Sequence, residues 1–430
     1  MNIINIYGSK NTILPLLALI CIYPSIYTFV NVPNILDLYS MLELLNQLNI
    51  KNNYINNILN IDSSNIIIPE KLYNSNNIRG NIYFFAILAR YKLFTKIQKS
   101  GGCLIGKRSI EMHIEYLKNL NIEIKQELDF YNIDSTKFLI EKSINYKFNK
   151  VSVGATINAI FGSIYGKGKI ELENCSKDLH IIEIIKVLNM MGVDIKIENS
   201  KITIIRTLEF NKVTSFKLLG DPIITGTYII FGTLLNSKIL YNGMNLNYLG
   251  DSYNILRNCG ILINQTNDNK FKITRLNKLN NFSISTQPYP GIATDLMPLF
   301  VILASQIGDC LIEENIFENR FKFIEELKKI NFDCVINNKS LYIKKKIYFY
   351  SKKNIIELNC TDIRGGMAII LASCILLNDY PNKVIHLKNI NYVKRGYHNL
   401  EDVLKIFNYN IINKEGYVIL EKNKVLIKTY

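Results

Sequence analysis

One phrase recurs six times along the chain, and it constrains the fold more than any other feature. Each copy contains the end of an amphipathic helix, then Gly or Asn, then an alternating apolar strand. The leading leucines of the copies are Leu45, Leu117, Leu188, Leu256, Leu327 and Leu404. Successive leucines lie between 68 (256 − 188) and 77 (404 − 327) residues apart. The Gly or Asn positions, where a helix is expected to end in the left-handed conformation, are Asn49, Asn121, Gly192, Gly260, Asn331 and Asn408.

The repeat predicts the fold class and the domains. Helix and strand alternate inside every unit, so the class is α/β, and six such units are too many for one core. Three plus three units with a boundary near Gly220 is the natural division. We expect one domain over residues 10–219 and a second that joins residues 1–9 to 220–430. We also expect hairpins after the helices, as in 193–198 with 201–206, and a ligand site in the cleft between the domains.

Composition excludes several classes of protein. The 51 Lys and Arg residues against 36 Asp and Glu favour anionic partners, but they are scattered, so nucleic-acid binding is not indicated. Eight cysteines without a C-x-x-C pair and four unpaired histidines argue against disulfides, zinc or a catalytic metal, and fit a reducing cytoplasm. The apolar run 13–23 is too short for a membrane span and predicts a buried first helix.

A glycine-rich segment carries a candidate nucleophile or acid. It reads K-S-G-G-C-L-I-G-K-R-S-I-E-M-H over residues 99–113. Cys103 lies between glycines and close in sequence to Lys99, Lys107 and Arg108, and nearby cations activate a thiol. The alternative is that Cys103 is a small buried hydrophobe, as most of the other cysteines are expected to be.

Several phrases together resemble the enolpyruvyl transferase family, in that family's order and from end to end. The phrases are G-S-K-N-T-I-L-P from Gly8, I-R-G from Ile78, the G-G-C segment, K-V-S-V-G-A-T from Lys150, P-G-I-A-T-D from Pro290, F-E-N-R-F from Phe317, T-D-I-R-G from Thr361 and K-R-G-Y from Lys394. The resemblance implies a two-domain inverted α/β barrel, with three βαβαββ repeats in each domain and the active site in the interdomain cleft.

The resemblance also implies a reaction and its partners. The enolpyruvyl group of phosphoenolpyruvate would pass to the 3′-hydroxyl of UDP-N-acetylglucosamine with release of phosphate, as in peptidoglycan synthesis. No cofactor, metal, nucleic acid or membrane is implied, and we expect a monomer or weak homo-oligomer.

The resemblance assigns the site residues. The catalytic set is Cys103, Asp295 and Lys10: the thiol of Cys103 resembles a general acid that can add to phosphoenolpyruvate and that fosfomycin attacks, and Asp295 matches the acceptor of the sugar hydroxyl proton. The residues matching phosphoenolpyruvate contacts are Lys10, Asn11, Arg108, Asp362, Arg364 and Arg395. Those matching nucleotide-sugar contacts are Asn11, Arg79, Arg108, Ser109, Ile110, Glu111, Met112, Lys150, Val151, Ser152, Val153, Gly154, Asp295, Ile316 and Phe317.

Alternative interpretations stand beside these. Local sequence favours Asp295 as the N-cap of the apolar helix 296–304, and Ser152 as an ordinary helix cap. Asp362 and Arg364 could form a structural ion pair.

Two other functions also compete. A sister enzyme that uses shikimate 3-phosphate shares the fold, although the G-G-C loop and K-V-S-V-G-A-T argue against it. A catalytically decayed relative is the other, because Pro222 and Ile224 stand where the family has a domain-linking Arg and Glu.

Overall fold

The computed structural model describes residues 2–74, 78–100, 105–106, 109–235, 239–267 and 269–423, without the side chain of Asn267. Within these residues the chain forms six four-stranded sheets with one shared pattern. In each sheet the first strand runs parallel to the second, and the second, third and fourth are antiparallel neighbours. The six predicted repeats therefore form six sheets of one strand order, which confirms the α/β class; in two of them the parallel edge strand, β13 or β1, comes from a distant part of the chain. Three sheets lie in each of two compact units.

The first unit comprises described residues of 7–102 and 108–219. Its sheets, in order of pairing, are β13 (Ser215–Lys217), β2 (Ile26–Val30), β4 (Ile58–Asp62) and β3 (Lys51–Ile55); β5 (Lys71–Leu72), β6 (Phe94–Gln98), β8 (Phe130–Asp134) and β7 (Glu123–Gln126); and β9 (Ile144–Lys147), β10 (Lys169–Glu173), β12 (Lys201–Ile205) and β11 (Asp194–Glu198). Its helices are α1 (Lys10–Leu19), α2 (Leu36–Gln47), α3 (Phe84–Ile87), α4 (Glu111–Lys118), α5 (Val153–Ile164) and α6 (Leu179–Met190), with 3-10 turns η1 (Arg79–Tyr83) and η2 (Leu88–Tyr91).

The second unit comprises described residues of 1–6, 103–107 and 220–430. Its sheets are β1 (Asn2–Asn5), β14 (Ile239–Asn242), β16 (Lys270–Arg275) and β15 (Ile261–Asn267); β17 (Ser283–Ser285), β18 (Cys310–Glu313), β20 (Ser340–Ile343) and β19 (Val335–Asn337); and β21 (Ile355–Asn359), β22 (Val384–Lys388), β24 (Tyr417–Lys422) and β23 (Tyr409–Lys414). Its helices are α7 (Pro222–Leu234), α8 (Asp251–Asn258), α9 (Met297–Ser305), α10 (Ile324–Lys328), α11 (Ile363–Asp379), α12 (Asn391–Lys394) and α13 (Leu400–Ile406), with the 3-10 turn η3 (Leu246–Leu249).

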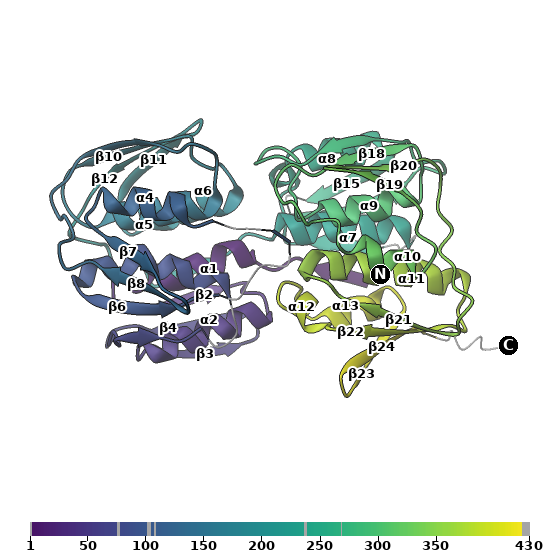
Figure 1. The fold of residues 1–430 in the computed structure, drawn as a ribbon, viewed down its shortest axis with the longest axis horizontal. Coiled ribbons are helices and arrows are strands. Elements are labelled where there is room, and N and C mark those ends of the chain that lie inside the picture. The colour runs from purple at the N-terminus through teal and green to yellow at the C-terminus, as the bar shows by residue number, and fades with distance from the viewer. Residues whose placement is uncertain are drawn as a thin grey trace. The chain divides into compact units, whose positions relative to one another are not determined.

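In each unit the most apolar helices lie inside and the sheets lie outside (Figure 1). Every residue of α9 is buried, and α11 is buried continuously from Arg364 to Leu377. Strands instead alternate buried residues with half-buried or exposed ones, as β6 and β22 do. A sheet with one solvent-exposed face packs on the outside of the unit, and a helix that is buried on all sides packs inside it. This is the inverted arrangement that the family resemblance implies.

All six repeat helices end at the predicted Gly or Asn. The φ angles there are positive, from 56° at Asn121 to 100° at Gly260. Only Gly and Asn adopt this conformation at low cost, so the prediction is confirmed at each copy. The predicted hairpin is also present as β11 and β12, which pair antiparallel around Asn199 at φ 55°.

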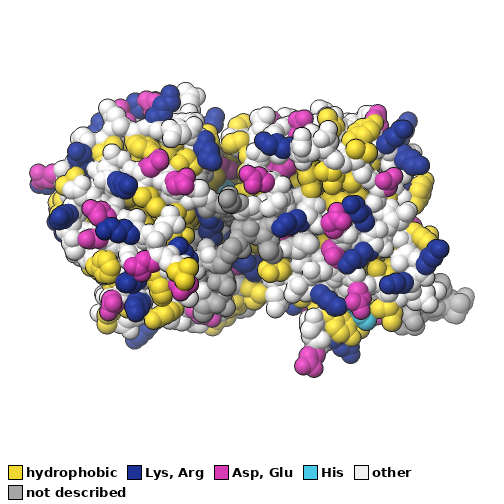
Figure 2. Space-filling model, viewed as in Figure 1, with side chains coloured by type: hydrophobic (Ala, Val, Ile, Leu, Met, Phe, Trp, Pro, Cys, Tyr) yellow, Lys and Arg dark blue, Asp and Glu magenta, His cyan; other side chains and the backbone are white. Residues whose placement is uncertain are grey.

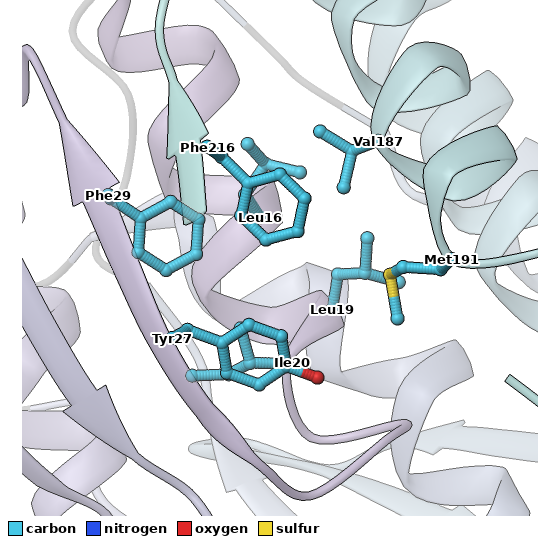
Figure 3. Close-up of a pocket in the computed structure, with 8 residues that line it drawn as sticks. All are labelled: Leu16, Leu19, Ile20, Tyr27, Phe29, Val187, Met191 and Phe216. Atoms are coloured by element: carbon cyan, nitrogen blue, oxygen red, sulfur yellow. The ribbon is translucent and has the colours of Figure 1, made fainter. Parts of the chain in front are cut away.

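The apolar run near the N-terminus forms α1, which is buried from Thr12 to Leu19 and passes through Pro15. No described helix has the length and apolarity needed to cross a bilayer. Beside α1 a small apolar pocket is lined by eight side chains (Figure 3). They are Leu16, Leu19, Ile20, Tyr27, Phe29, Val187, Met191 and Phe216. On the face shown in Figure 2, Lys and Arg side chains are interspersed with Asp and Glu, as the scattered charges in the sequence suggest.

Helix α7 begins where the sequence departs from the family pattern. Asp221 caps it, accepting hydrogen bonds from the N–H groups of Ile223 (2.7 Å) and Ile224 (3.3 Å). Pro222 follows at the first helical position, where its missing N–H costs nothing. The residues that differ from the family pattern therefore form a regular N-terminus of α7.

Candidate active site

The centre of the second unit's candidate site is Asp295, held between two buried arginines. Its Oδ1 accepts from Arg320 Nη2 at 2.9 Å, and its Oδ2 accepts from Arg364 Nε at 3.2 Å. The side chains of Arg320 and Arg364 are 2% and 4% exposed, whereas that of Asp295 is 29% exposed. The two guanidinium groups thus balance the negative charge of a carboxylate that is still partly exposed to solvent.

The structure decides against the helix-cap interpretation of Asp295. Helix α9 starts at Met297, its N-cap is Leu296, and no side chain caps it. Asp295 lies one residue too early, and both of its oxygens bind arginines instead. Two arginines from distant segments therefore fix the orientation of this carboxylate.

Asp362 and Arg364 do not form an ion pair with each other, so that interpretation is wrong. Asp362 caps α11 by accepting from the backbone N–H groups of Arg364 (3.0 Å) and Gly365 (3.1 Å), and its carboxylate pairs with Arg320 at 3.4 Å. The side chain of Arg364 pairs with Asp295. Each member of the predicted pair thus has its own partner in one connected network.

The other side of Arg364 faces an aromatic ring. Its guanidinium carbon lies 5.1 Å from the ring centroid of Tyr397, whose hydroxyl is 3.3 Å from Thr227 Oγ1. Burial lowers the pKa of Arg364, but Tyr397 and Asp295 raise it, and the net shift is upward. Burial raises the pKa of Tyr397. Arg395 ends the short helix α12 two residues before Tyr397, which brings this predicted phosphoenolpyruvate ligand into the same region.

Two predicted nucleotide-sugar contacts, Ile316 and Phe317, follow strand β18. Their backbone N–H groups donate to Glu314 Oε1 at 2.8 and 2.9 Å. Sequence reasoning assigned no role to Glu314, Arg320 or Tyr397. A signal existed for two of them, since Arg320 and Tyr397 lie inside the phrases F-E-N-R-F and K-R-G-Y.

In the first unit, Lys10 and Asn11 start helix α1. Ser9 caps this helix by accepting from the N–H of Asn11 at 3.2 Å. Lys10 Nζ lies 2.5 Å from Asp37 Oδ2, a buried carboxylate in the first turn of α2. The ion pair leaves the Lys10 side chain 15% exposed at the helix N-terminus.

A second group of predicted contacts in this unit lies at the start of α4. Arg79 Nη2 donates to Ser109 O at 3.4 Å, and the Ser109 hydroxyl accepts from the N–H of Glu111 at 3.0 Å. Ile110 and Glu111 then begin α4, which carries Met112 and the buried His113.

His113 joins α4 to the start of α5. Its Nδ1 lies 2.7 Å from Asn158 Nδ2, and a Cβ on Gly154 would approach the imidazole to 3.1 Å. Glycine therefore gives the helix a close approach to the ring, which a larger residue would reach only if the ring shifted. Burial, aided by the charge of Arg79, lowers the pKa of His113 to about 3.

The segment Lys150–Gly154 leads into α5. Ser152 is the N-cap, accepting from the N–H of Ala155 at 3.4 Å, so the helix-cap interpretation is confirmed. The first-turn N–H groups of a helix suit an anion. Arg79 contacts Ser109, and Gly154 lies against His113 of the neighbouring helix α4.

Cys103 and Arg108 lie outside the described residues. The seven described cysteines are buried or half-buried, and burial raises the pKa of each thiol, to about 12 for Cys175 and about 11 for Cys334. The expectation that most cysteines are small hydrophobes is confirmed for these seven.

Comparison with known proteins decides the family. A profile described as EPSP synthase (3-phosphoshikimate 1-carboxyvinyltransferase) matches residues 2–404. The chain belongs to this enolpyruvyl transferase family. UDP-N-acetylglucosamine 1-carboxyvinyltransferase of Rickettsia prowazekii is 32% identical over 417 residues, covering 95% of this chain and 96% of that protein. The protein of that name from Halothermothrix orenii is 27% identical over 403 residues, covering 93% and 94%.

Solved structures of the family share the fold. The enolpyruvyl transferase NikO from Streptomyces tendae gives a TM-score of 0.80 at 16% identity, covering 99% of this chain and 97% of its own. EPSP synthase from Acinetobacter baumannii gives 0.63 at 15% identity, covering 87% and 88%. The two-domain α/β fold of this family member is thereby confirmed.

Proposed function

We propose that this chain transfers the enolpyruvyl group of phosphoenolpyruvate to the 3′-hydroxyl of UDP-N-acetylglucosamine and releases phosphate, the first committed step of peptidoglycan precursor synthesis. The observation that carries the proposal is the placement of Asp295, a partly exposed carboxylate oriented by Arg320 at 2.9 Å and Arg364 at 3.2 Å. A carboxylate with its orientation fixed and one side open is suited to accept a proton from a bound hydroxyl. Relatives at 27–32% identity carry the name of this activity over more than 90% of both chains.

The reaction proceeds by addition and elimination. The 3′-oxygen bonds to C2 of phosphoenolpyruvate as its proton passes to Asp295, and Cys103 gives a proton to the methylene carbon. In the elimination the new methyl group returns a proton to the thiolate of Cys103, its C–H electron pair forms the C=C double bond, the C2–O bond to phosphate breaks, and phosphate leaves. The proton on Asp295 then passes to solvent. Each step builds or removes negative charge, which fixed cations stabilise.

Fixed cations serve the phosphoenolpyruvate substrate in this proposal. Lys10, Arg108 and Arg395 hold the phosphate and carboxylate of phosphoenolpyruvate, and an arginine matches either anion with two parallel hydrogen bonds. Arg364 and Asp362 support that set from the start of α11. The nucleotide sugar binds the group of Arg79, Ser109 and the α5 N-terminus, where first-turn N–H groups favour the pyrophosphate.

The remaining expectations belong to the same proposal. The reaction takes place in the cytoplasm, and the chain works as a monomer or a weak homo-oligomer. It uses no cofactor and no metal.

Phosphate release from phosphoenolpyruvate tests the proposal, with UDP-N-acetylglucosamine and shikimate 3-phosphate as alternative acceptors. We expect release with the nucleotide sugar alone, and loss or strong slowing in Cys103→Ser. Release with shikimate 3-phosphate alone would assign the chain to the sister activity. A folded chain that releases phosphate with neither acceptor would be a decayed relative.

A further inference from the structure

A buried carboxylate that the proposed reaction does not use lies directly after strand β18. Glu314 is 3% exposed, and both of its oxygens accept hydrogen bonds. Oε1 accepts from the backbone N–H groups of Ile316 (2.8 Å) and Phe317 (2.9 Å). Oε2 accepts from the hydroxyl of Thr294 at 2.9 Å. One side chain therefore ties together two segments of the second unit.

The two segments carry predicted substrate contacts. Thr294 immediately precedes Asp295, so its hydroxyl anchors the backbone that presents the proton acceptor. On the other side, N–H groups of Ile316 and Phe317 are bound to Glu314, which fixes the direction of the backbone at these residues.

The same segment also contacts two described residues of the glycine-rich segment 99–113. The N–H of Asn319 donates to Ile105 O at 3.1 Å, and a Cβ on Gly106 would lie 3.5 Å from the Glu318 nitrogen. Glu314 thus supports the backbone on which Ile105 and Gly106 rest. Ile105 follows Cys103 by two residues in the sequence.

We propose that Glu314 is a positioning residue, which holds Asp295 and the Ile316–Phe317 backbone in the relation needed to place the sugar of the nucleotide-sugar substrate. The inference rests on the proposed function and adds a residue to it. Glu314 is not a catalytic residue, because it is buried and both oxygens already accept hydrogen bonds. Its effect passes through Thr294 and through the 316–317 backbone.

The side-chain chemistry distinguishes two substitutions. In Glu314→Gln the remaining carbonyl oxygen can still accept from both N–H groups, and the amide can donate to the Thr294 oxygen, so both links persist. In Glu314→Ala two N–H groups and a hydroxyl lose their acceptor, and both segments relax. A misplacement of about 1 Å costs roughly 100-fold in rate.

The test is steady-state kinetics of the full chain with each substrate varied. We expect Glu314→Ala to lower kcat/KM for UDP-N-acetylglucosamine by roughly 100-fold, with a higher KM for the nucleotide sugar and a KM for phosphoenolpyruvate changed by less than about threefold. Glu314→Gln should stay within about threefold of the parent chain. Thr294→Val, which cuts only the link toward Asp295, should lower kcat by about tenfold with little change in KM.

A matched control separates positioning from general loss of stability. Tyr409→Phe removes a hydroxyl of the same unit that lies 2.7 Å from Cys374 O and 2.8 Å from Asn378 Oδ1, and touches neither segment. It should lower the melting temperature and leave both KM values unchanged. If Glu314→Ala does not fold, the Gln and Thr294 variants still decide the question.

The outcomes are distinct. A parent chain that turns over UDP-N-acetylglucosamine, together with a Glu314→Ala variant of unchanged KM and kcat, overturns the positioning role alone. Equal rises in KM for both substrates overturn it as well, because the substitution then acts on the whole unit. A folded parent chain without turnover overturns the proposed function and this inference with it.

Discussion

Replacing Asp295 by Asn tests the central cluster most directly, since the amide has the shape of the carboxylate without its charge. Asp295 makes one hydrogen bond to each arginine, at 2.9 and 3.2 Å. The amide of Asn keeps one acceptor oxygen, so one bond is lost and the other becomes charged-to-neutral. Arg320 retains Asp362 at 3.4 Å as a partner. The guanidinium of Arg364 loses the acceptor of its Nε.

The magnitude follows from these contacts. A hydrogen bond to a charged group contributes about 1.5–3 kcal/mol, and a neutral one about 1 kcal/mol. Losing one charged bond and weakening the other gives about 3 kcal/mol. For a unit of this size 1 kcal/mol corresponds to roughly 2–4 °C, so its melting temperature should fall by roughly 6–12 °C. Loss of the proton acceptor should separately lower kcat by about 100-fold to 10,000-fold.

Scanning calorimetry and phosphate release measure the two effects, with Asp309→Asn as the matched control. Asp309 is an exposed carboxylate of the same unit that accepts from Asn281 (2.9 Å) and Tyr342 (2.8 Å). Its φ of 51° suits Asn, so the same chemical change should be nearly neutral there. If Asp295→Asn melts together with this control, the ion-pair account is wrong. If it keeps kcat within threefold, Asp295 is not the proton acceptor.

Four further predictions concern other parts of the chain. Because the pKa of His113 falls from 6.5 to about 3 on folding, the unfolded chain takes up the proton first as the pH drops. The contribution of His113 to the free energy of unfolding is therefore complete above pH 6.5 and should fall by roughly 2 kcal/mol by pH 5. In urea titrations at the two pH values, His113→Leu should not show this loss. Gly154→Ala should cost about 1 kcal/mol and raise KM for the nucleotide sugar, because its Cβ would meet the imidazole at 3.1 Å; an unchanged melting curve would contradict this. Since every described thiol has a raised pKa, mass spectrometry after brief alkylation at pH 7 should find the label on Cys103, and rapid labelling that persists in Cys103→Ser would refute that. Val187 points into the pocket of Figure 3, so Val187→Ile should stabilise the first unit by about 0.5–1 kcal/mol, whereas a lower melting temperature would mean that the added methyl group overpacks it.

The sequence predicted the candidate site unevenly. Motif phrases identified Asp295, Arg364 and Arg395, and the structure places all three in one region of the second unit. Local reasoning alone misassigned Asp295 to a helix cap, because a polar residue before an apolar run is the usual signal for one. Glu314 carries no such signal, since an acidic residue at the end of a strand is unremarkable until its partners are known.

The sequence by itself determined the repeat, the α/β class and the six helix ends, and only the tertiary structure decided the side-chain network. A left-handed Asn or Gly at a helix end depends on the backbone preferences of one residue, so Asn331 can be predicted from its neighbours. The contacts of Asp295 instead join residues 25 and 69 positions away. Such contacts form only when packed helices and strands bring the segments together, and the desolvation of the buried arginines then selects which carboxylates pair with them.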